Sequence, residues 1–267
     1  MKLTFLGTGS FFSGYDINHT NLLFTSDSGK NLLLDCSSRI PLMLEKLKID
    51  PSVIDAVYIS HMHDDHAGGL EWLAFYDFFV KGVRPDLFCH KDLMDILWEK
   101  RLQAAAGVVR NKTTTMDDFF RSWEVYEGFI FDGIIDCILA PVVHVENGSS
   151  SVISHGLEIK FHGKTIYWTS DMGEVEQVET SSKPRPRSDY HWALNCKRYC
   201  EADIIIQDCE LGSYPSRVHV HYNTLRGLPG AIKKNMLLCH YGSRKGLPNA
   251  KKDGFMGFAK PGQVIKI

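Results

Sequence analysis

The chain has 267 residues, of which 44% are hydrophobic and 23% are charged, the ordinary balance of a globular protein. This length and composition exclude a disordered chain and allow a sizeable core. The 30 Lys and Arg residues stand against 32 Asp and Glu residues, and the formal charge of −2 excludes a global positive field that would attract nucleic acid.

Alternating apolar runs and turn residues predict the elements of the first half. Strands are expected at residues 2–6, 21–25, 31–35 and 55–60, and helices at 38–48, 68–80, 91–103 and 115–124. The first of these helices has Pro41 near its start, a position that proline favours. The aromatic residues within 68–80 are expected to pack in the core.

The second half repeats this alternation, with strands expected at 134–143, 151–161, 164–170, 203–207 and 236–239, and a helix near 222–232. Strands outnumber helices in both halves. The pattern therefore predicts an α/β sandwich, with two sheets inside and helices outside, as a single domain over residues 1–267. Residues 174–202 are too long and irregular for a plain connection. They are expected to be a surface insertion, or else a basic flap or partner contact.

The start of the chain, MKLTFLGTGS, lacks the apolar run of a signal peptide. No stretch approaches the ~20 apolar residues of a membrane helix. The seven cysteines are odd in number and scattered along the chain. We therefore expect a cytoplasmic protein with reduced thiols and no membrane partner.

Metal-binding side chains are concentrated in His61-Met62-His63-Asp64-Asp65-His66, directly after the expected strand at 55–60. Imidazole nitrogen and carboxylate oxygen suit zinc and its first-row neighbours. Alternate residues of an extended segment point the same way, so His61 and His63 can share one ion. Asp65 and His66, on the next bend, can face a neighbouring ion. A solvated polar loop is the alternative.

Further ligand-type residues directly follow apolar runs. These residues are His144, Asp171, Asp208 and His240. Sites in layered α/β folds gather at the C-terminal ends of strands, so we expect these side chains to converge. For any one of them alone, a satisfied polar residue at a strand end is an equally good interpretation.

Together these residues resemble the metallo-β-lactamase superfamily, whose signature is HxHxDH followed by separate His, Asp and His ligands. Their order and spacing are most similar to the RNase Z-like phosphodiesterase branch. The opening LTFLGTGS resembles the first strand and turn of that branch, and LLLDCSS resembles its LLDCG segment, with Ser37 where glycine is usual. The resemblance implies a four-layer αββα sandwich with two divalent metal ions, Zn or Mn.

Residue by residue, the resemblance assigns His61, His63 and His144 to one ion, Asp65, His66 and His240 to the second, and Asp171 to a bridging position. It also implies that Asp65 orients or deprotonates the attacking water. Asp64 replaces the small residue common at its position and is expected to add a carboxylate near the second ion.

His219, in VHVHYNTL, stands where the branch has a histidine that assists at the leaving group. Asp208 stands near the position of the glutamate partner of that histidine in RNase Z. His221 could take the role of His219. The implied reaction is hydrolysis of a phosphodiester, in which a hydroxide bridging the two ions attacks phosphorus and His219 protonates the leaving alkoxide.

Three functions compete at this point. RNase Z grips tRNA with a long arm between the ligands that match His144 and Asp171, but only 26 residues separate these two here. The compact chain is similar to the anti-Pycsar proteins, phage and bacterial members of the branch that degrade cyclic mononucleotide signals. A small cyclic nucleotide substrate, and with it evasion of immune signalling, is therefore favoured. A tRNA 3′-end endonuclease and a non-catalytic metal-binding regulatory protein are the alternatives.

Proteins of this branch are commonly homodimers, so a homodimer is expected. The aromatic-rich stretch from Trp98 to Trp123, with Phe119 and Phe120, is either an interface between subunits or part of the core.

Overall fold

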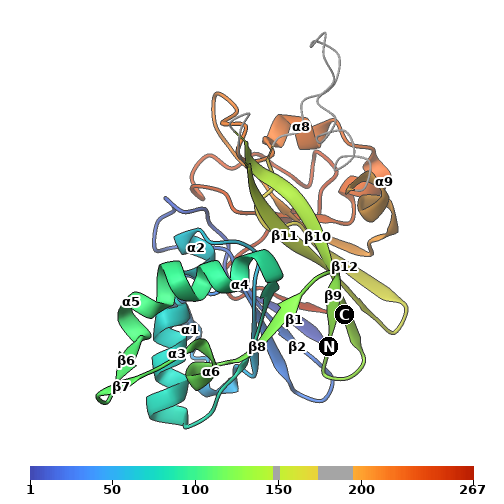
Figure 1. The fold of residues 1–267 in the computed structure, drawn as a ribbon. Coiled ribbons are helices and arrows are strands. Elements are labelled where there is room, and N and C mark those ends of the chain that lie inside the picture. The colour runs from blue at the N-terminus through green and yellow to red at the C-terminus, as the bar shows by residue number, and fades with distance from the viewer. Residues whose placement is uncertain (147–150, 174–194) are drawn as a thin grey trace. The chain divides into compact units, whose positions relative to one another are not determined.

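The computed structural model describes residues 1–146, 151–173 and 195–267. These residues form two compact units, Met1–Glu127 with Lys260–Ile267, and Gly128–Ala259. Each unit contains one seven-stranded sheet, and Figure 1 shows both sheets with their helices. The mixed α/β class predicted from the sequence is therefore present, while the single-domain organisation over 1–267 stays a prediction.

The sheet of the first unit has the strand order β16-β1-β2-β3-β4-β5-β8. Its strands are β1 (Lys2–Gly7), β2 (Asn21–Thr25), β3 (Asn31–Leu34), β4 (Ala56–Ile59), β5 (Asp86–His90), β8 (Arg121–Val125) and β16 (Val264–Lys266). Strands β3, β4, β5 and β8 pair in parallel. Their carboxyl ends therefore lie along the same edge of the sheet, which is where sites form in α/β folds.

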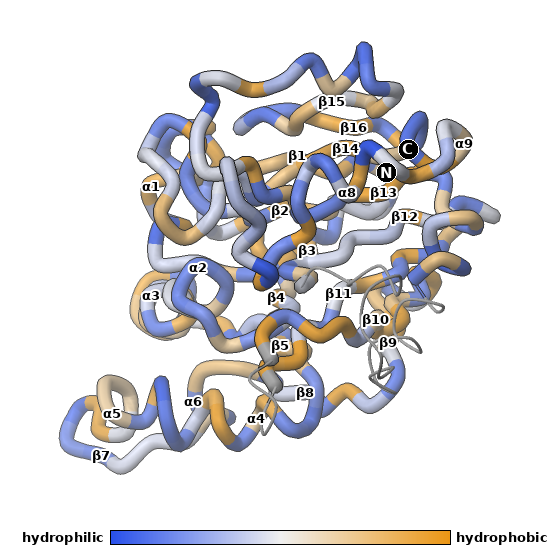
Figure 2. Tube along the Cα trace, turned by 90° about the horizontal axis from the view of Figure 1, so that it is seen from above, coloured by the Kyte–Doolittle hydropathy of each residue, from blue (hydrophilic) through white to orange (hydrophobic). Residues whose placement is uncertain are grey.

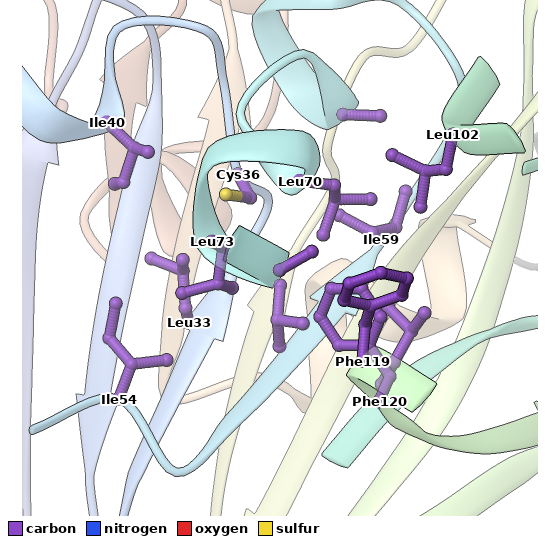
Figure 3. Packing of buried hydrophobic residues seen from close by; sticks show 14 of the residues in the cluster. Leu33, Cys36, Ile40, Ile54, Ile59, Leu70, Leu73, Leu102, Phe119 and Phe120 are labelled. Atoms are coloured by element: carbon purple, nitrogen blue, oxygen red, sulfur yellow. The ribbon is translucent and has the colours of Figure 1, made fainter. Parts of the chain in front are cut away.

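Helices and strands of the first unit share one apolar cluster. The helices are α1 (Ile40–Leu47), α2 (Asp64–Ala67), α3 (Leu70–Tyr76), α4 (Lys91–Leu97), α5 (Gln103–Ala106) and α6 (Met116–Phe119). Strands β6 (Val108–Val109) and β7 (Lys112–Thr113) form a separate hairpin. Leu33 and Ile59, from the sheet region, pack with Ile40, Leu73 and Phe119 of the helices, and Figure 3 shows this packing.

The predicted helix at 115–124 is wrong beyond Phe119, because residues 121–125 form strand β8. The cause is a tertiary contact: Arg121 Nε and Nη2 donate to the two carboxylate oxygens of Asp86 at 2.8 and 3.0 Å, and β8 pairs with β5 along its length. Strand β5 was not predicted from the sequence either. Phe119 and Phe120 are 1% and 0% exposed, so they belong to the core of the unit rather than to a subunit interface.

A carboxylate is buried at the C-terminal end of α3. Asp77 begins a π-helical turn, Asp77–Lys81, and its side chain is fully buried. Among the described residues no hydrogen bond reaches its two carboxylate oxygens, and Lys81 Nζ lies 3.9 Å from Oδ1. Burial raises the pKa of Asp77 to about 6, against the opposing effect of Lys81.

This raised pKa predicts a pH-dependent contribution to stability. Between the unfolded pKa and the folded pKa the native state holds the Asp77 proton more tightly, so the free energy of unfolding falls as pH rises through this window. In Asp77→Asn this fall is absent. The stability of the variant relative to the wild type should therefore rise by about 1–3 kcal/mol between about pH 4 and pH 7. Urea unfolding across this range measures it, with exposed Asp117→Asn as the control. Parallel stability curves would contradict it.

The sheet of the second unit has the strand order β15-β14-β13-β12-β11-β10-β9. Its strands are β9 (Gly128–Phe131), β10 (Ile135–Glu146), β11 (Ser151–Phe161), β12 (Lys164–Trp168), β13 (Ile204–Asp208), β14 (Met236–Cys239) and β15 (Gly257–Phe258). Strands β12 to β15 pair in parallel, and β10 and β11 form the long antiparallel pair seen in Figure 1. The parallel strands again bring several carboxyl ends to one edge.

Short helices complete the second unit. They are α8 (Tyr222–Arg226), α9 (Gly230–Lys233) and the helical residues 195–201. Tyr199 and Leu225 from these helices pack with Tyr167 and Leu238 of the sheet. The predicted helix at 222–232 is interrupted before Pro229, because proline cannot donate a backbone hydrogen bond inside a helix.

The surface insertion predicted at 174–202 is only partly described. Residues 174–194 lie outside the described residues, whereas 195–201 are helical. Asn195 and Tyr199 are 1% and 2% exposed, and the Tyr167 hydroxyl donates to the side chain of Asn195. This end of the predicted insertion therefore belongs to the core of the second unit.

Candidate metal centre

The HxHxDH segment of the first unit begins just past β4, at the carboxyl edge of its sheet. His61 is fully buried, and His63 is the most exposed of the four ligand-type residues. The expected bend at Asp65 and His66 is the short helix α2, which Figure 2 draws in the hydrophilic colour. Asp65 and His66 are nevertheless only 2% and 1% exposed. Polar groups are rarely buried without a partner, so the burial of these two side chains indicates a polar site that the fold forms at this position.

The side chains of this segment lie in pairs. His61 Nε2 is 3.0 Å from His63 Nδ1, and His66 Nε2 is 3.3 Å from Asp65 Oδ2. Within this segment, residues that the resemblance assigns to the same ion therefore lie next to one another.

Asp35 is a supporting residue whose role the sequence analysis missed. It directly follows β3 and is fully buried. Its carboxylate accepts hydrogen bonds from Ser60 N at 2.8 Å, from Ser60 Oγ at 2.9 Å and from His66 Nδ1 at 2.6 Å. Burial raises its pKa, whereas His66 and Ser60 act in the opposite direction. Its position after an apolar strand is the same signal that singled out Asp171 and Asp208, and could have found it.

The Asp35 carboxylate fixes the ring of His66 so that Nε2 is the atom directed toward Asp65. Partners of this kind orient ligands and raise their basicity, and their loss typically costs 10–100-fold in metal affinity. We expect Asp35→Asn to weaken metal binding by about this factor with the fold retained. Competition with a chromophoric chelator measures the affinity, and circular dichroism checks the fold. An unchanged affinity would show that His66 needs no such support.

Asp64 does not join the other carboxylate of the segment. Its Oδ1 accepts a hydrogen bond from Arg101 Nη2 at 3.1 Å, and its Oδ2 accepts one from the Ser38 hydroxyl. The expectation that Asp64 adds a carboxylate beside the second ion is therefore wrong. Its pairing with Arg101 instead ties α2 to the helical segment around Trp98–Leu102.

The second unit brings His144, Asp171 and His240 together from three strands. His144 lies on β10, while Asp171 and His240 follow β12 and β14. His144 Nε2 is 3.4 Å from Asp171 Oδ2, and His240 Nδ1 is 2.9 Å from Asp171 Oδ1. All three residues are 3% exposed. His144 Nδ1 donates to Val218 O at 2.8 Å, which directs Nε2 toward Asp171.

Several strands that lead to the ligand-type residues are followed by a residue whose backbone has the left-handed conformation. Asp35, Ser170 and His240 have φ values of 60°, 52° and 63°. Residues with a side chain pay an energetic cost in this region, and such strain clusters at functional sites. The turn that each makes ends its strand and sets the direction of the neighbouring ligand-type side chain.

Within each unit the donor atoms suit a divalent metal ion in chemistry and in spacing. Two ligands about 2.0–2.1 Å from a tetrahedral zinc ion lie roughly 3.3 Å apart. The pairs His61–His63, His66–Asp65 and His144–Asp171 have their donor atoms 3.0, 3.3 and 3.4 Å apart. The His and Asp clusters of the described residues are therefore suited to binding metal ions.

His219 and Asp208 form a further pair in the second unit. His219 Nδ1 donates to Asp208 Oδ2 at 2.8 Å, and Asp208 is 1% exposed. Met172 N also donates to Asp208 Oδ2, at 3.0 Å, which fixes the carboxylate. Burial lowers the pKa of His219, but Asp208 and Asp171 outweigh this effect and raise it to about 9. The imidazole is therefore held as a proton donor at neutral pH.

His221 has a different role. Its Nδ1 accepts from Asn223 N at 3.2 Å and caps α8, while its Nε2 donates to Gly212 O at 3.0 Å. Both ring nitrogens are thus used by the backbone. Of the two histidines left open by the sequence, the geometry favours His219 for proton transfer.

Solved structures with the same fold define the class of the protein. The metallo-β-lactamase fold protein YhfI from Bacillus subtilis aligns with a TM-score of 0.70 at 20% identity, covering 99% of this chain and 98% of the other. The short form of human tRNase Z aligns with a TM-score of 0.67 at 18% identity, covering 100% and 99%. The chain therefore has the metallo-β-lactamase fold, and the fold class predicted from the sequence is confirmed.

Sequence relatives narrow this class to a family. The family model "Anti-Pycsar protein Apyc1" matches residues 1–265. A relative of that description from Paenibacillus harenae is 31% identical over 245 residues, covering 90% of this chain and 89% of the relative. Another from Saccharibacillus brassicae is 29% identical over 272 residues, covering 100% of both. The chain belongs to the anti-Pycsar Apyc1 family.

Helices long and apolar enough to cross a membrane do not occur among the residues that the structure describes.

Proposed function

We propose that this protein is a metal-dependent phosphodiesterase that hydrolyses a cyclic mononucleotide and so removes an immune signal. The observation that carries the proposal is membership of the anti-Pycsar family over residues 1–265, because the anti-Pycsar proteins that the sequence resembles degrade such signals. The ligand-type clusters of the two units and the His219–Asp208 pair support the hydrolytic chemistry.

The segment between His144 and Asp171 argues against a tRNA substrate. Strands β11 (Ser151–Phe161) and β12 (Lys164–Trp168) occupy most of this segment and belong to the sheet. Of the residues between the two ligands only 147–150 are undescribed, which is too few for a tRNA-gripping arm. The near-neutral charge also offers few phosphate contacts.

The side chains have separate tasks in the proposed reaction. The ligand set assigned from the resemblance is His61, His63, Asp65, His66, His144, Asp171 and His240. Divalent ions bound there would supply Lewis-acid stabilisation of the phosphate charge and would acidify the water that acts as nucleophile. Asp65 orients that water or accepts its proton. His219 protonates the leaving alkoxide, and Asp208 fixes its ring and raises its pKa.

A substrate panel tests the proposal. The purified protein, loaded with Zn or Mn, is incubated with pyrimidine and purine 3′,5′-cyclic mononucleotides, with precursor tRNA and with bis-p-nitrophenyl phosphate, and the products are identified. Conversion of a cyclic nucleotide to a linear monophosphate is expected. Cleavage of the tRNA alone would move the function to an endonuclease. Metal binding without turnover of any substrate would make the protein a non-catalytic metal-binding regulator.

The homodimer and the cytoplasmic location stay predictions from the sequence. Zinc remains the proposed metal and manganese the alternative, since a His and Asp ligand set accepts both ions.

A further inference from the structure

Aromatic side chains are exposed on the loop between β1 and β2 of the first unit. Phe12 is 92% exposed, and Phe11 and Tyr15 are 44% and 64% exposed. The rings of Phe11 and Phe12 meet edge to face with their centroids 4.9 Å apart. Phe12 is almost fully exposed and is supported by the Phe11 ring, so it presents a flat apolar face to solvent. Planar ligands stack on such faces.

Hydrogen bonds hold the backbone of this loop in one conformation. Gly9 N donates to Asn18 O and Thr20 N donates to Gly9 O, both at 2.8 Å. Arg39 Nη1 donates to Ser13 O at 2.7 Å. A Cβ atom at position 9 would collide with Ser13 and Asn18, so this loop conformation requires glycine there. Phe12 is therefore presented by an ordered loop, which lowers the entropic cost of binding a ligand.

The same loop is connected to the helix that carries two of the ligand-type residues. The Phe11 ring stacks on His19 with an interplanar angle of 10°, and His19 Nε2 donates to Phe11 O at 3.1 Å. Two residues on, the Asn21 side chain contacts Asp65 O at 3.5 Å and accepts a hydrogen bond from Ser37 N at 3.1 Å. The aromatic pair and α2 are thus linked by a short chain of contacts inside one unit.

A positive charge accompanies the aromatic rings. The Arg39 guanidinium lies 4.6 Å from the centroid of the Tyr15 ring, on the loop that carries Phe12. A cation beside flat apolar rings complements a ligand with a planar ring system and a negative charge. A cyclic mononucleotide has both of these properties, whereas an aliphatic phosphodiester lacks the planar part.

We propose that Phe12, braced by Phe11, is the platform on which the nucleobase of the substrate stacks. This inference rests on the proposed function and adds a residue that determines affinity for the base. Stacking tolerates any base because every base has a π-face. Phe12 therefore contributes to the binding of purine and pyrimidine substrates alike, and discrimination between them comes from other residues.

Steady-state kinetics on the metal-loaded protein test the platform. Phe12→Ala should raise KM for each cyclic nucleotide that the wild type hydrolyses by about 5- to 150-fold, the range for loss of one base–aromatic stack, with kcat nearly unchanged. Phe12→Tyr should restore KM. A ribose cyclic phosphate that lacks a base should show the same KM in all three proteins. Tyr126→Ala, which removes another exposed aromatic ring of the same unit, is the matched control and should leave KM unchanged.

The outcomes separate this inference from the proposed function. If the wild type hydrolyses cyclic nucleotides and Phe12→Ala keeps its KM, the platform is wrong and the function stands. A change in sedimentation mass with an unchanged KM would place Phe12 in a contact between two copies of the chain and also overturn it. If the wild type hydrolyses none, the proposed function fails and binding alone decides. Nucleoside monophosphates should then quench the additional fluorescence of Phe12→Trp, and no quenching would reject the platform.

Discussion

Replacing His63 with alanine is expected to abolish hydrolysis and to lower the amount of bound metal. In the first unit His63 Nδ1 lies 3.0 Å from His61 Nε2, the spacing of two ligands on one ion. Removing one donor leaves His61 without its neighbour at that ion. Elemental analysis of the purified protein measures the metal, and hydrolysis of bis-p-nitrophenyl phosphate measures turnover.

A histidine outside the candidate site provides the control for this result. His162 lies in the turn between β11 and β12 with a φ of 48°, a conformation that asparagine tolerates. His162→Asn should keep both the metal content and the activity. If His63→Ala retained full metal content and full turnover, the assignment of the HxHxDH segment as a metal site would be refuted.

Replacing His219 with alanine should slow the reaction by about 10²–10⁴-fold, the usual contribution of general acid catalysis, with the metal content retained. The reason is that Asp208 holds His219 Nδ1 at 2.8 Å and the pKa of His219 is about 9, so the ring is protonated at neutral pH. The wild-type rate should therefore fall as pH rises through about 9, where the acid loses its proton. The variant should lack this fall. Rate measurements from neutral to alkaline pH test both effects.

His221 supplies the comparison for the acid role. Because His221 caps α8 through Nδ1, His221→Asn keeps an acceptor for Asn223 N and should keep the rate and its pH profile. Full activity in His219→Ala, together with a slow His221→Asn protein, would transfer the acid role to His221. A loss of metal in His219→Ala would instead assign His219 to the ligands.

Local patterns predicted much of the fold and of the candidate site. Most expected strands occur within a residue or two of their predicted bounds, because apolar runs between turn residues report burial directly. Asp171, Asp208 and His240 lie near one another in the second unit, since the parallel strands β12, β13 and β14 align their carboxyl ends. His144 joins them from within the antiparallel strand β10. Only the identities of neighbouring residues are needed for this kind of inference.

Where the sequence analysis failed, contacts distant in the chain decided the outcome. Residues 121–125 have a helical pattern but form a strand, because β5 and Asp86 offer them partners some 35 positions away. The Asp64 carboxylate accepts a hydrogen bond from Arg101, which lies 37 positions further along the chain. The role of Asp35 in orienting His66 depends on the pairing of β3 with β4, which brings Ser60 and His66 within hydrogen-bonding distance.

The amino-acid sequence by itself determined the set of candidate metal-binding residues, because the kinds of donor atoms and their order along the chain are properties of the chain. The tertiary structure decided which ring nitrogen faces which partner. It placed His221 at the N-terminus of α8, paired His219 with the buried Asp208, and exposed Phe12 on a loop held by hydrogen bonds. Such choices depend on hydrogen bonds and packing between segments far apart in sequence, whose energies exist only once the sheets have formed.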